Sequence, residues 1–270
     1  MIPIGARNAL SESLLLACMG WARLFARPGI PILCYHRIAD DEAVATVTLR
    51  AFQRQMALLR AWDYQAVGIE DVISQLAGGG SVPRRWVALT FDDGYRSFLT
   101  EASPVLREFS FTASVFVPTD YAGRQASWDA EGAASGADVL SWDEMRELAD
   151  AGFRFYPHGV SHGRLTRIAD DELERELRES REAVEAQLGR PALVCCYPYG
   201  DYDARVIEAT CAAGFRGACG LRPDLNRSPD HLWDLRRFMV LRTTTLRGFR
   251  SRVTGAFACY AGMRRLLRGE

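Results

Sequence analysis

Lysine is absent from this sequence, and its absence excludes several kinds of chemistry. All 33 basic residues in the 270-residue chain are arginines. Schiff-base and lysine-nucleophile mechanisms are therefore excluded, and pyridoxal-phosphate chemistry with them. The formal net charge is only −1 and no DNA- or RNA-binding signature is present, which indicates that nucleic acid is not a partner.

Long apolar runs are also missing. No stretch approaches the roughly 20 apolar residues that a membrane-spanning helix needs. The apolar stretch 14–25 is short, follows Glu12 and lacks a small-residue cleavage site, which is more typical of an amphipathic helix than of a signal peptide. The lack of a clear export signal predicts a cytoplasmic protein, either in solution or at the inner face of the membrane.

Cysteine is present in a pattern that does not suit disulfides. The chain has seven cysteines, an odd number, and none of them are in C-x-x-C spacing. An oxidised framework favours an even set, so we predict that these residues are reduced thiols in the core.

The remaining pattern predicts an α/β protein with a single large domain. Strand-like apolar runs alternate with segments of helical spacing, and no internal repeat or linker interrupts them. A length of 270 residues suits one barrel-sized unit. Strands are expected at 30–36, 86–91, 112–117, 153–158, 193–198, 215–219 and 238–241, and helices at 51–61, 97–109, 141–151, 170–188, 203–213 and 246–267.

Polar clusters follow several of the expected strands, where β/α folds place their catalytic side chains. A single aspartate after a strand is commonly a helix cap, but Asp92 and Asp93 are adjacent after a buried run. Two further clusters include His36 and His158, which are two of only four histidines in the chain. These clusters lie at 34–37, 90–94, 156–158 and 197–200.

His158 and His162 are separated by three residues. On a helical turn, this spacing points two imidazoles in one direction, so that they can share a metal ion. Two histidines and one carboxylate leave coordination positions open for water and substrate. A second acid beside the ligands can then accept a proton from water, and the combination suits metal-assisted hydrolysis.

Residues 90–95 (Thr-Phe-Asp-Asp-Gly-Tyr) and the pair His158 and His162 resemble motifs of the NodB-like polysaccharide deacetylases, carbohydrate esterase family 4. The resemblance covers roughly residues 29–242, although Gly159 replaces the usual Ser or Thr after the first histidine. It implies a distorted (β/α) barrel over 29–245. An amphipathic segment, 1–28, would precede this deacetylase domain, and a basic helix within 246–270 would pack on or beside it.

The same resemblance implies an activity and a ligand set. The expected function is metal-dependent removal of an N-acetyl group from an amino sugar in a polysaccharide, an oligosaccharide or a lipid-linked saccharide. Asp92 would be the general base. Asp93, His158 and His162 would hold one divalent ion, zinc by preference, with cobalt, nickel or manganese as alternatives.

Two departures from the common family pattern resemble a permuted branch that acts on surface polysaccharides. Cys196 stands where the family usually has an arginine, and no Leu-x-His occurs near the carboxyl end. By this resemblance His36 would be the catalytic acid, and the backbone N–H of Tyr199 the oxyanion donor. Arg237 is the candidate to supply the missing positive charge to Asp92.

Several alternatives stay open from the sequence alone. His36 could be a structural core histidine, and Trp128 could stack on a sugar or anchor a loop. We expect His231 to be a surface residue. The arginine-rich terminal helix is either a solvated face or, with the amphipathic segment 1–28, a peripheral contact with anionic lipid.

The substrate and the assembly are open as well. A deformylase or other N-deacylase of a lipid-linked amino sugar would use the same site. A catalytically inactive carbohydrate-binding domain is disfavoured because all four motif residues are present. The oligomeric state is not predicted.

Overall fold

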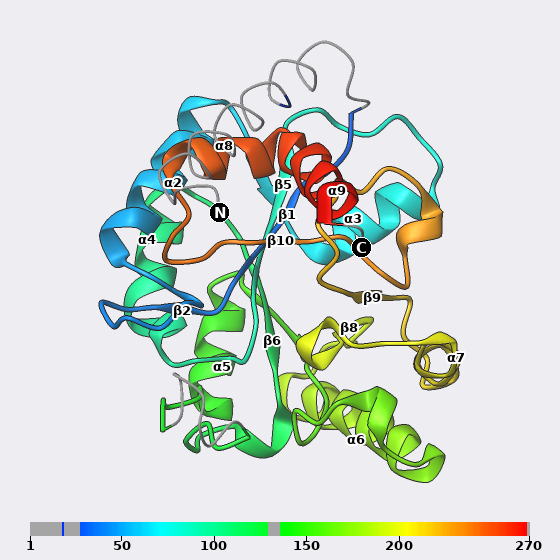
Figure 1. Cartoon of the computed structure of the whole chain (residues 1–270). Coiled ribbons are helices and arrows are strands. Elements are labelled where there is room, and N and C mark those ends of the chain that lie inside the picture. Colours follow the sequence, from blue (N-terminus) through cyan, green and yellow to red (C-terminus); the bar gives the residue numbers. More distant parts are fainter. Residues whose placement is uncertain (1–17, 19–27, 129–135, 269–270) are drawn as a thin grey trace.

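The centre of the protein is a parallel sheet. The computed structural model describes residue 18 and residues 28–128 and 136–268, and Figure 1 shows their arrangement. The main sheet has the order β10-β1-β5-β6-β7, and β4 pairs with the first half of β5. Its strands are β1 (Ile32–Tyr35), β4 (Gln65–Val67), β5 (Trp86–Phe91), β6 (Ser114–Val117), β7 (Arg154–Pro157) and β10 (Phe238–Met239).

Two shorter strand pairs extend this sheet toward a distorted barrel. β8 (Val194–Cys196) and β9 (Gly217–Cys219) form a parallel pair, and β8 packs beside β7. A bridge from Cys219 to Leu235 then leads the chain back toward β10. The other pair is β2 (Arg37–Ile38) with β3 (Thr46–Val47), beside the end of β1. The predicted α/β fold is therefore confirmed.

Helices cover the sheet on both sides. In Figure 1, α2, α4 and α5 lie along one flank, whereas α6 and α7 lie near β8 and β9. Ser141 and Glu144 form a capping box at the start of α5. The helices are α2 (Leu49–Ala61), α3 (Ile69–Ala77), α4 (Ser103–Glu108), α5 (Trp142–Asp150), α6 (Asp170–Leu188), α7 (Ala204–Ala212), α8 (Leu246–Val253) and α9 (Ala256–Arg268).

An aromatic cluster holds β1 against β5 and thereby aligns the strand ends. The ring of Tyr35 lies 5.2 Å from that of Phe91 and 5.3 Å from that of Phe52 on α2. Buried aromatic contacts of this kind stabilise a core beyond the area that they bury. Because Tyr35 pairs with Phe91 across the two strands, the residues that follow, His36 and Asp92, emerge side by side.

Two helix predictions need correction, and one helix was not predicted. The expected helix 97–109 begins with a π-helical turn, Phe98–Ala102, before α4. The expected single helix 246–267 is two helices, because Gly255 takes a left-handed conformation (φ 76°) between α8 and α9. Strand β4 was not expected, because three strand residues give too short a periodic signal; α3 was not expected either, although its buried residues follow helical spacing.

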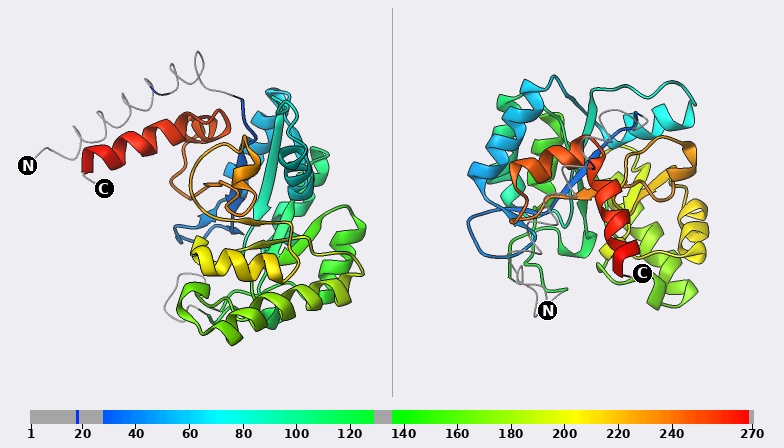
Figure 2. Two further views of the ribbon diagram at one scale, coloured as in Figure 1. Left: turned by 90° about the vertical axis from the view of Figure 1, so that its right-hand side faces the viewer. Right: turned by 45° about the horizontal axis from the view of Figure 1, so that its top comes forward.

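The termini are only partly within the described residues. The predicted amphipathic segment 1–28 lies outside them except for Cys18 and residue 28. Figure 2 shows α9 extending beyond the body of the domain. No helix in the described part of the chain is long and apolar enough to cross a membrane. The cytoplasmic location and the lipid contact stay predictions.

Some residues differ in burial from what we expected. All seven cysteines are free thiols, and Cys34, Cys195, Cys196 and Cys219 are buried as predicted, but Cys211 is exposed on the outer face of α7. Arg252 is not on a solvated helix face: it is buried, and its Nε donates to the Met239 carbonyl over 2.8 Å. The long aliphatic stem of arginine allows such burial when its nitrogens find acceptors.

Candidate active site

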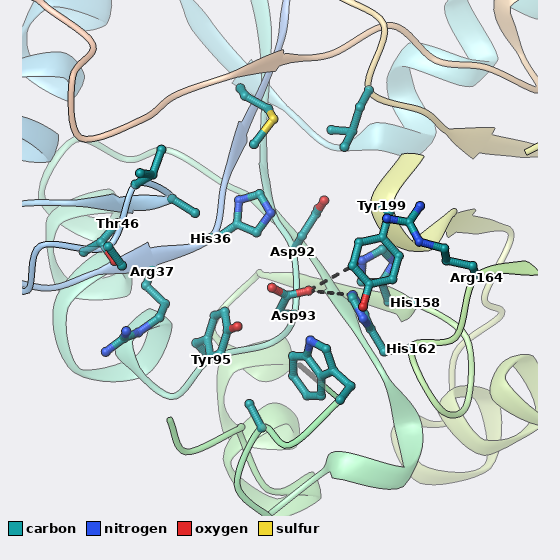
Figure 3. A pocket seen from close by; sticks show the side chains of 17 residues that line it. His36, Arg37, Thr46, Asp92, Asp93, Tyr95, His158, His162, Arg164 and Tyr199 are labelled. Atoms are coloured by element: carbon teal, nitrogen blue, oxygen red, sulfur yellow. Dashed lines mark ion pairs between the residues drawn. The ribbon is translucent and has the colours of Figure 1, made fainter. Parts of the chain in front are cut away.

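The strand ends open into a cleft of about 520 Å³. Figure 3 shows its side chains converging around Asp93. The seventh predicted site residue, Arg237, does not line the cleft but lies behind Asp92, fully buried. The other six predicted residues line it: His36, Asp92, Asp93, His158, His162 and Tyr199.

Asp93 and the two motif histidines form a compact group of buried side chains. Oδ1 of Asp93 lies 3.1 Å from Nε2 of His162 and 3.6 Å from Nε2 of His158. Each residue offers one ligand atom within 4.8 Å of the others. Asp93 reaches this position through a left-handed backbone (φ 71°), followed by Gly94, where a Cβ would meet Val117 at 2.9 Å. The turn after β5 therefore needs glycine at that position.

The segment that carries the histidines is a loop and not the helical turn that we expected. Residues 158–162 follow β7 without helical structure. Gly159 and His162 both have left-handed backbones, with φ of 75° and 61°. These two reversals, rather than helical periodicity, bring the imidazole of His162 back beside that of His158, with ring centroids 4.8 Å apart.

His158 has the tautomer that a metal ligand needs. Its Nδ1 lies 2.7 Å from the carbonyl oxygen of Cys196, which can only accept, so Nδ1 carries the hydrogen and Nε2 faces Asp93. Burial, followed by the neighbouring His162, lowers the pKa of His158 to about 4. The imidazole is therefore neutral near pH 7, with a free lone pair at the cleft.

Asp92 is held by Arg237 in a two-pronged ion pair. Nη1 and Nη2 of Arg237 donate to Oδ1 and Oδ2 of Asp92 over 2.6 and 2.7 Å. Nε of Arg237 also donates to the carbonyl of Gly220, just after β9, over 2.7 Å. Burial alone favours the neutral carboxyl, but the charge and hydrogen bonds of Arg237 outweigh it and hold the pKa of Asp92 well below its usual value. Asp92 is therefore an oriented carboxylate.

Two buried thiols complete the surroundings of Asp92. Sγ of Cys34 lies 3.4 Å and Sγ of Cys196 3.6 Å from Oδ2 of Asp92. Burial raises the pKa of both thiols well above the usual value, so they stay protonated. The small side chain of Cys196 leaves room for Arg237, whose Nη2 is 3.0 Å from its sulfur. The guanidinium thus enters from the segment before β10 instead of from position 196.

His36 lies in the same cleft, on the other side of Asp92 from the His158–His162 loop. The His36 imidazole, the Cys34 thiol and the Asp92 carboxylate each have one potential metal-ligating atom, and these three atoms lie within 4.8 Å of one another. Nδ1 of His36 is buried and has no hydrogen-bond partner among the described residues. The structure therefore places His36 at the site, whereas His231 does not line the cleft.

Residues 79–218, more than half of the chain, match the family model for polysaccharide deacetylase. The chain belongs to the polysaccharide deacetylase family. The matched region contains Asp92, Asp93, His158 and His162 but neither His36 nor Arg237, and the permuted-branch arrangement stays a prediction.

Known deacetylases resemble this chain in sequence or in fold. The poly-β-1,6-N-acetyl-D-glucosamine N-deacetylase of Escherichia coli (strain K12) is 32% identical over 131 residues, which are 45% of this chain and 19% of that protein. The structure of the Streptococcus pyogenes deacetylase PplD in complex with acetate has a TM-score of 0.73 and 22% identity, over 84% of this chain and 99% of that one. A polysaccharide deacetylase structure from Bacillus cereus has a TM-score of 0.70 and 26% identity, over 84% and 70%.

The mouth of the deacetylase cleft has two arginine–tyrosine walls that we did not predict from the sequence. On one side, Arg37 lies over the ring of Tyr95 at 5.7 Å and pairs with Asp41 at 2.8 Å. Arginine stacked on an aromatic ring is fixed in orientation. Figure 3 shows Arg37 and Tyr95 on the opposite side of Asp93 from the second wall.

The second wall is built in the same way. Arg164 lies over the ring of Tyr199 at 4.2 Å and pairs with Asp201 at 3.2 Å. The ring of Tyr199 in turn lies 4.8 Å from that of His162. The only sequence signal for Arg37 and Arg164 is their nearness to His36 and His162, which by itself does not separate a wall residue from a surface charge.

Trp128 closes the remaining side of the cleft. Its indole lies 4.8 Å from the imidazole of His162 and 4.7 Å from the ring of Tyr121. Trp128 packs against Tyr121 as a loop anchor and also lines the cleft, whereas stacking of its indole on a sugar stays a prediction.

Proposed function

We propose that this protein is a zinc-dependent N-deacetylase of a neutral polymer of N-acetylglucosamine. The observation that supports the activity most strongly is the buried group Asp93–His158–His162 beside the oriented carboxylate of Asp92. A three-ligand group next to a separate carboxylate is what metal-assisted hydrolysis of an amide requires.

The donor set fits a divalent ion. Two imidazoles and a carboxylate are ligands that zinc accepts, and His158 is fixed by its bond to a backbone carbonyl, as metal-bound histidines usually are. When bound, the ion supplies a Lewis acid that activates water and polarises the acetyl carbonyl. The cleft beyond these ligands gives substrate and water access to the open side.

The surrounding residues divide the proton transfers between them. Asp92 accepts the proton of the attacking water, and Arg237 holds its carboxylate in one orientation. His36, on the other side of Asp92, donates a proton to the departing amine, which leaves poorly without one. The backbone N–H of Tyr199, in a left-handed residue (φ 61°) beside His162, donates to the developing oxyanion.

The charges at the cleft mouth favour a neutral sugar over a phosphate-linked one. Arg37 and Arg164 each have a carboxylate partner, Asp41 and Asp201. Strong phosphate binding needs arginine forks that are not already neutralised, whereas sugar hydroxyls can bond to guanidinium and carboxylate together. The E. coli relative is named for poly-β-1,6-N-acetyl-D-glucosamine, and we propose the same class of polymer here.

The test is acyl release by the purified protein after loading with one equivalent of zinc. We expect acetate from poly-β-1,6-N-acetylglucosamine oligomers, loss of activity with a chelator, and recovery when zinc is returned. Parallel assays use an N-formylated oligomer and a lipid-pyrophosphate-linked N-acetylhexosamine. Faster release from the formylated oligomer or from the lipid-linked sugar would identify that compound as the better substrate. A protein that hydrolyses none of the three compounds would refute the proposal.

Replacing His36 is expected to slow the chemical step without loss of metal. In His36→Ala the departing amine has no positioned donor, so kcat should fall by about 10²–10⁴-fold. Single-turnover kinetics and metal analysis measure the rate and the metal content, with His231→Ala as the matched control. A wild-type rate in His36→Ala would show that the acid lies elsewhere.

A further inference from the structure

A buried glutamate outside the cleft holds the loop that carries the two histidine ligands. Glu176 lies in α6 with 2% of its surface exposed. Its Oε2 accepts the N–H of Val160 over 2.7 Å and that of Ser161 over 3.1 Å, and Oε1 lies 3.2 Å from the Ser161 nitrogen. Both N–H groups belong to the segment between His158 and His162.

The carboxylate is satisfied by backbone groups instead of by a basic side chain. No ion pair of Glu176 occurs among the described residues. A buried carboxylate is costly unless hydrogen bonds compensate for the lost water. The Val160 and Ser161 N–H groups supply that compensation only while the loop keeps its present path, so the charge of Glu176 selects one loop conformation.

Gly159 fits this arrangement in two ways. Its backbone is left-handed (φ 75°), which favours glycine, and a Cβ there would lie 2.9 Å from Oε2 of Glu176. On the other side of the loop, the Gly159 carbonyl accepts the N–H of Thr119 over 3.1 Å, and the Val160 carbonyl accepts that of Asp120 over 3.1 Å. The loop is thus held between α6 and the segment after β6.

We propose that Glu176 is a positioning residue that sets the metal affinity of the site by fixing the relative orientation of His158 and His162. The proposal rests on the metal site of the proposed function. Glu176 does not line the cleft. It acts through the backbone of residues 160 and 161, and a residue of this kind changes metal binding more than it changes the fold.

The experiment measures the zinc dissociation constant of Glu176→Gln by competition with a chromophoric chelator. The glutamine keeps the size of the side chain but places an NH2 donor against one of the two N–H groups. We expect zinc affinity to fall about 10–100-fold, as for other residues that orient metal ligands. The melting temperature of the metal-free protein should stay close to that of the control.

The matched control is Glu185→Gln in the same helix. Oε1 of Glu185 accepts the backbone N–H of Ala192 over 3.0 Å, in a loop that does not carry metal ligands, and it also pairs with Nε of Arg181 over 3.2 Å. This variant should lose a comparable backbone bond with unchanged zinc affinity. Equal zinc affinities in the two variants and the wild type would overturn the positioning role.

A second variant keeps the test decisive if Glu176→Gln does not fold. Gly159→Ala places a methyl group against Oε2 of Glu176 and strains the left-handed backbone, so zinc affinity should fall in the same range. Wild-type affinity in Gly159→Ala would contradict the proposal. A wild-type protein that binds no zinc would instead refute the proposed function, so the two failures are distinguishable.

Discussion

Asp92→Asn is expected to keep its metal and lose about 10²–10⁴-fold in kcat, the usual contribution of a general base. Asparagine preserves the size of the side chain but has no lone pair basic enough to accept the proton of water. Asp92 is not the carboxylate nearest the histidines: Oδ1 of Asp93 lies 3.1 Å from His162. Loss of turnover without loss of metal is therefore the result expected if Asp92 is the general base.

The adjacent aspartate provides the contrast for this experiment. Asp93→Asn removes the negative charge from the ligand group, whose other two members are histidines. It should therefore weaken zinc binding together with turnover. Metal stoichiometry after dialysis and kcat on one N-acetylglucosamine oligomer distinguish the variants. If both proteins keep full metal and lose the same activity, the roles of Asp92 and Asp93 are misassigned.

Arg237→Ala is expected to destabilise the fold by about 3–5 kcal/mol, because it leaves the carboxylate of Asp92 buried without its charge partner. Arg237 is fully buried and makes both bonds to Asp92. Turnover should fall as well, because Asp92 loses its fixed orientation. Urea unfolding measures the free energy of unfolding of each variant.

Two further variants distinguish the loss of the buried Asp92–Arg237 ion pair from the general effect of removing an arginine. Arg178 pairs with Glu174 over 3.0 Å on the exposed face of α6, so Arg178→Ala should cost only about 0.2–1 kcal/mol. The double variant Asp92→Asn with Arg237→Ala removes the orphan charge and should recover part of the lost stability. A double variant less stable than Arg237→Ala would contradict this account.

The effect of Arg237 should also depend on pH. The pKa of Asp92 is lowered in the folded protein. The stabilisation that the Asp92–Arg237 ion pair gives the fold is therefore fully present above the unfolded-state pKa of about 3.9. It is lost as the pH falls toward the lower folded-state pKa. The stability difference between wild type and Arg237→Ala should therefore narrow on acidification below about pH 4. A constant difference would argue against the ion pair as its cause.

Much of the site could be identified from local pattern. The runs before Asp92 and His158 are apolar enough to predict buried strands, and parallel strands bring their carboxyl ends to one edge. These strand patterns and the family resemblance together predict the α/β fold, the candidate ligands Asp93, His158 and His162, and the place of His36. Each of these residues lies in a short motif that follows a strand.

Tertiary packing decided the remainder, because it depends on contacts between distant segments. Arg237, which the sequence offered only as a candidate partner of Asp92, reaches it across 145 positions through the pairing of β10 with β1, and no local pattern specifies that two-pronged contact. The histidine loop is shaped by left-handed residues and by Glu176 in α6, not by helical periodicity. The arginine–tyrosine walls depend likewise on how loops from different strands meet. Short-range periodicity predicts where strands and helices form, but which side chains face one another is settled only when the sheet order and loop paths are set.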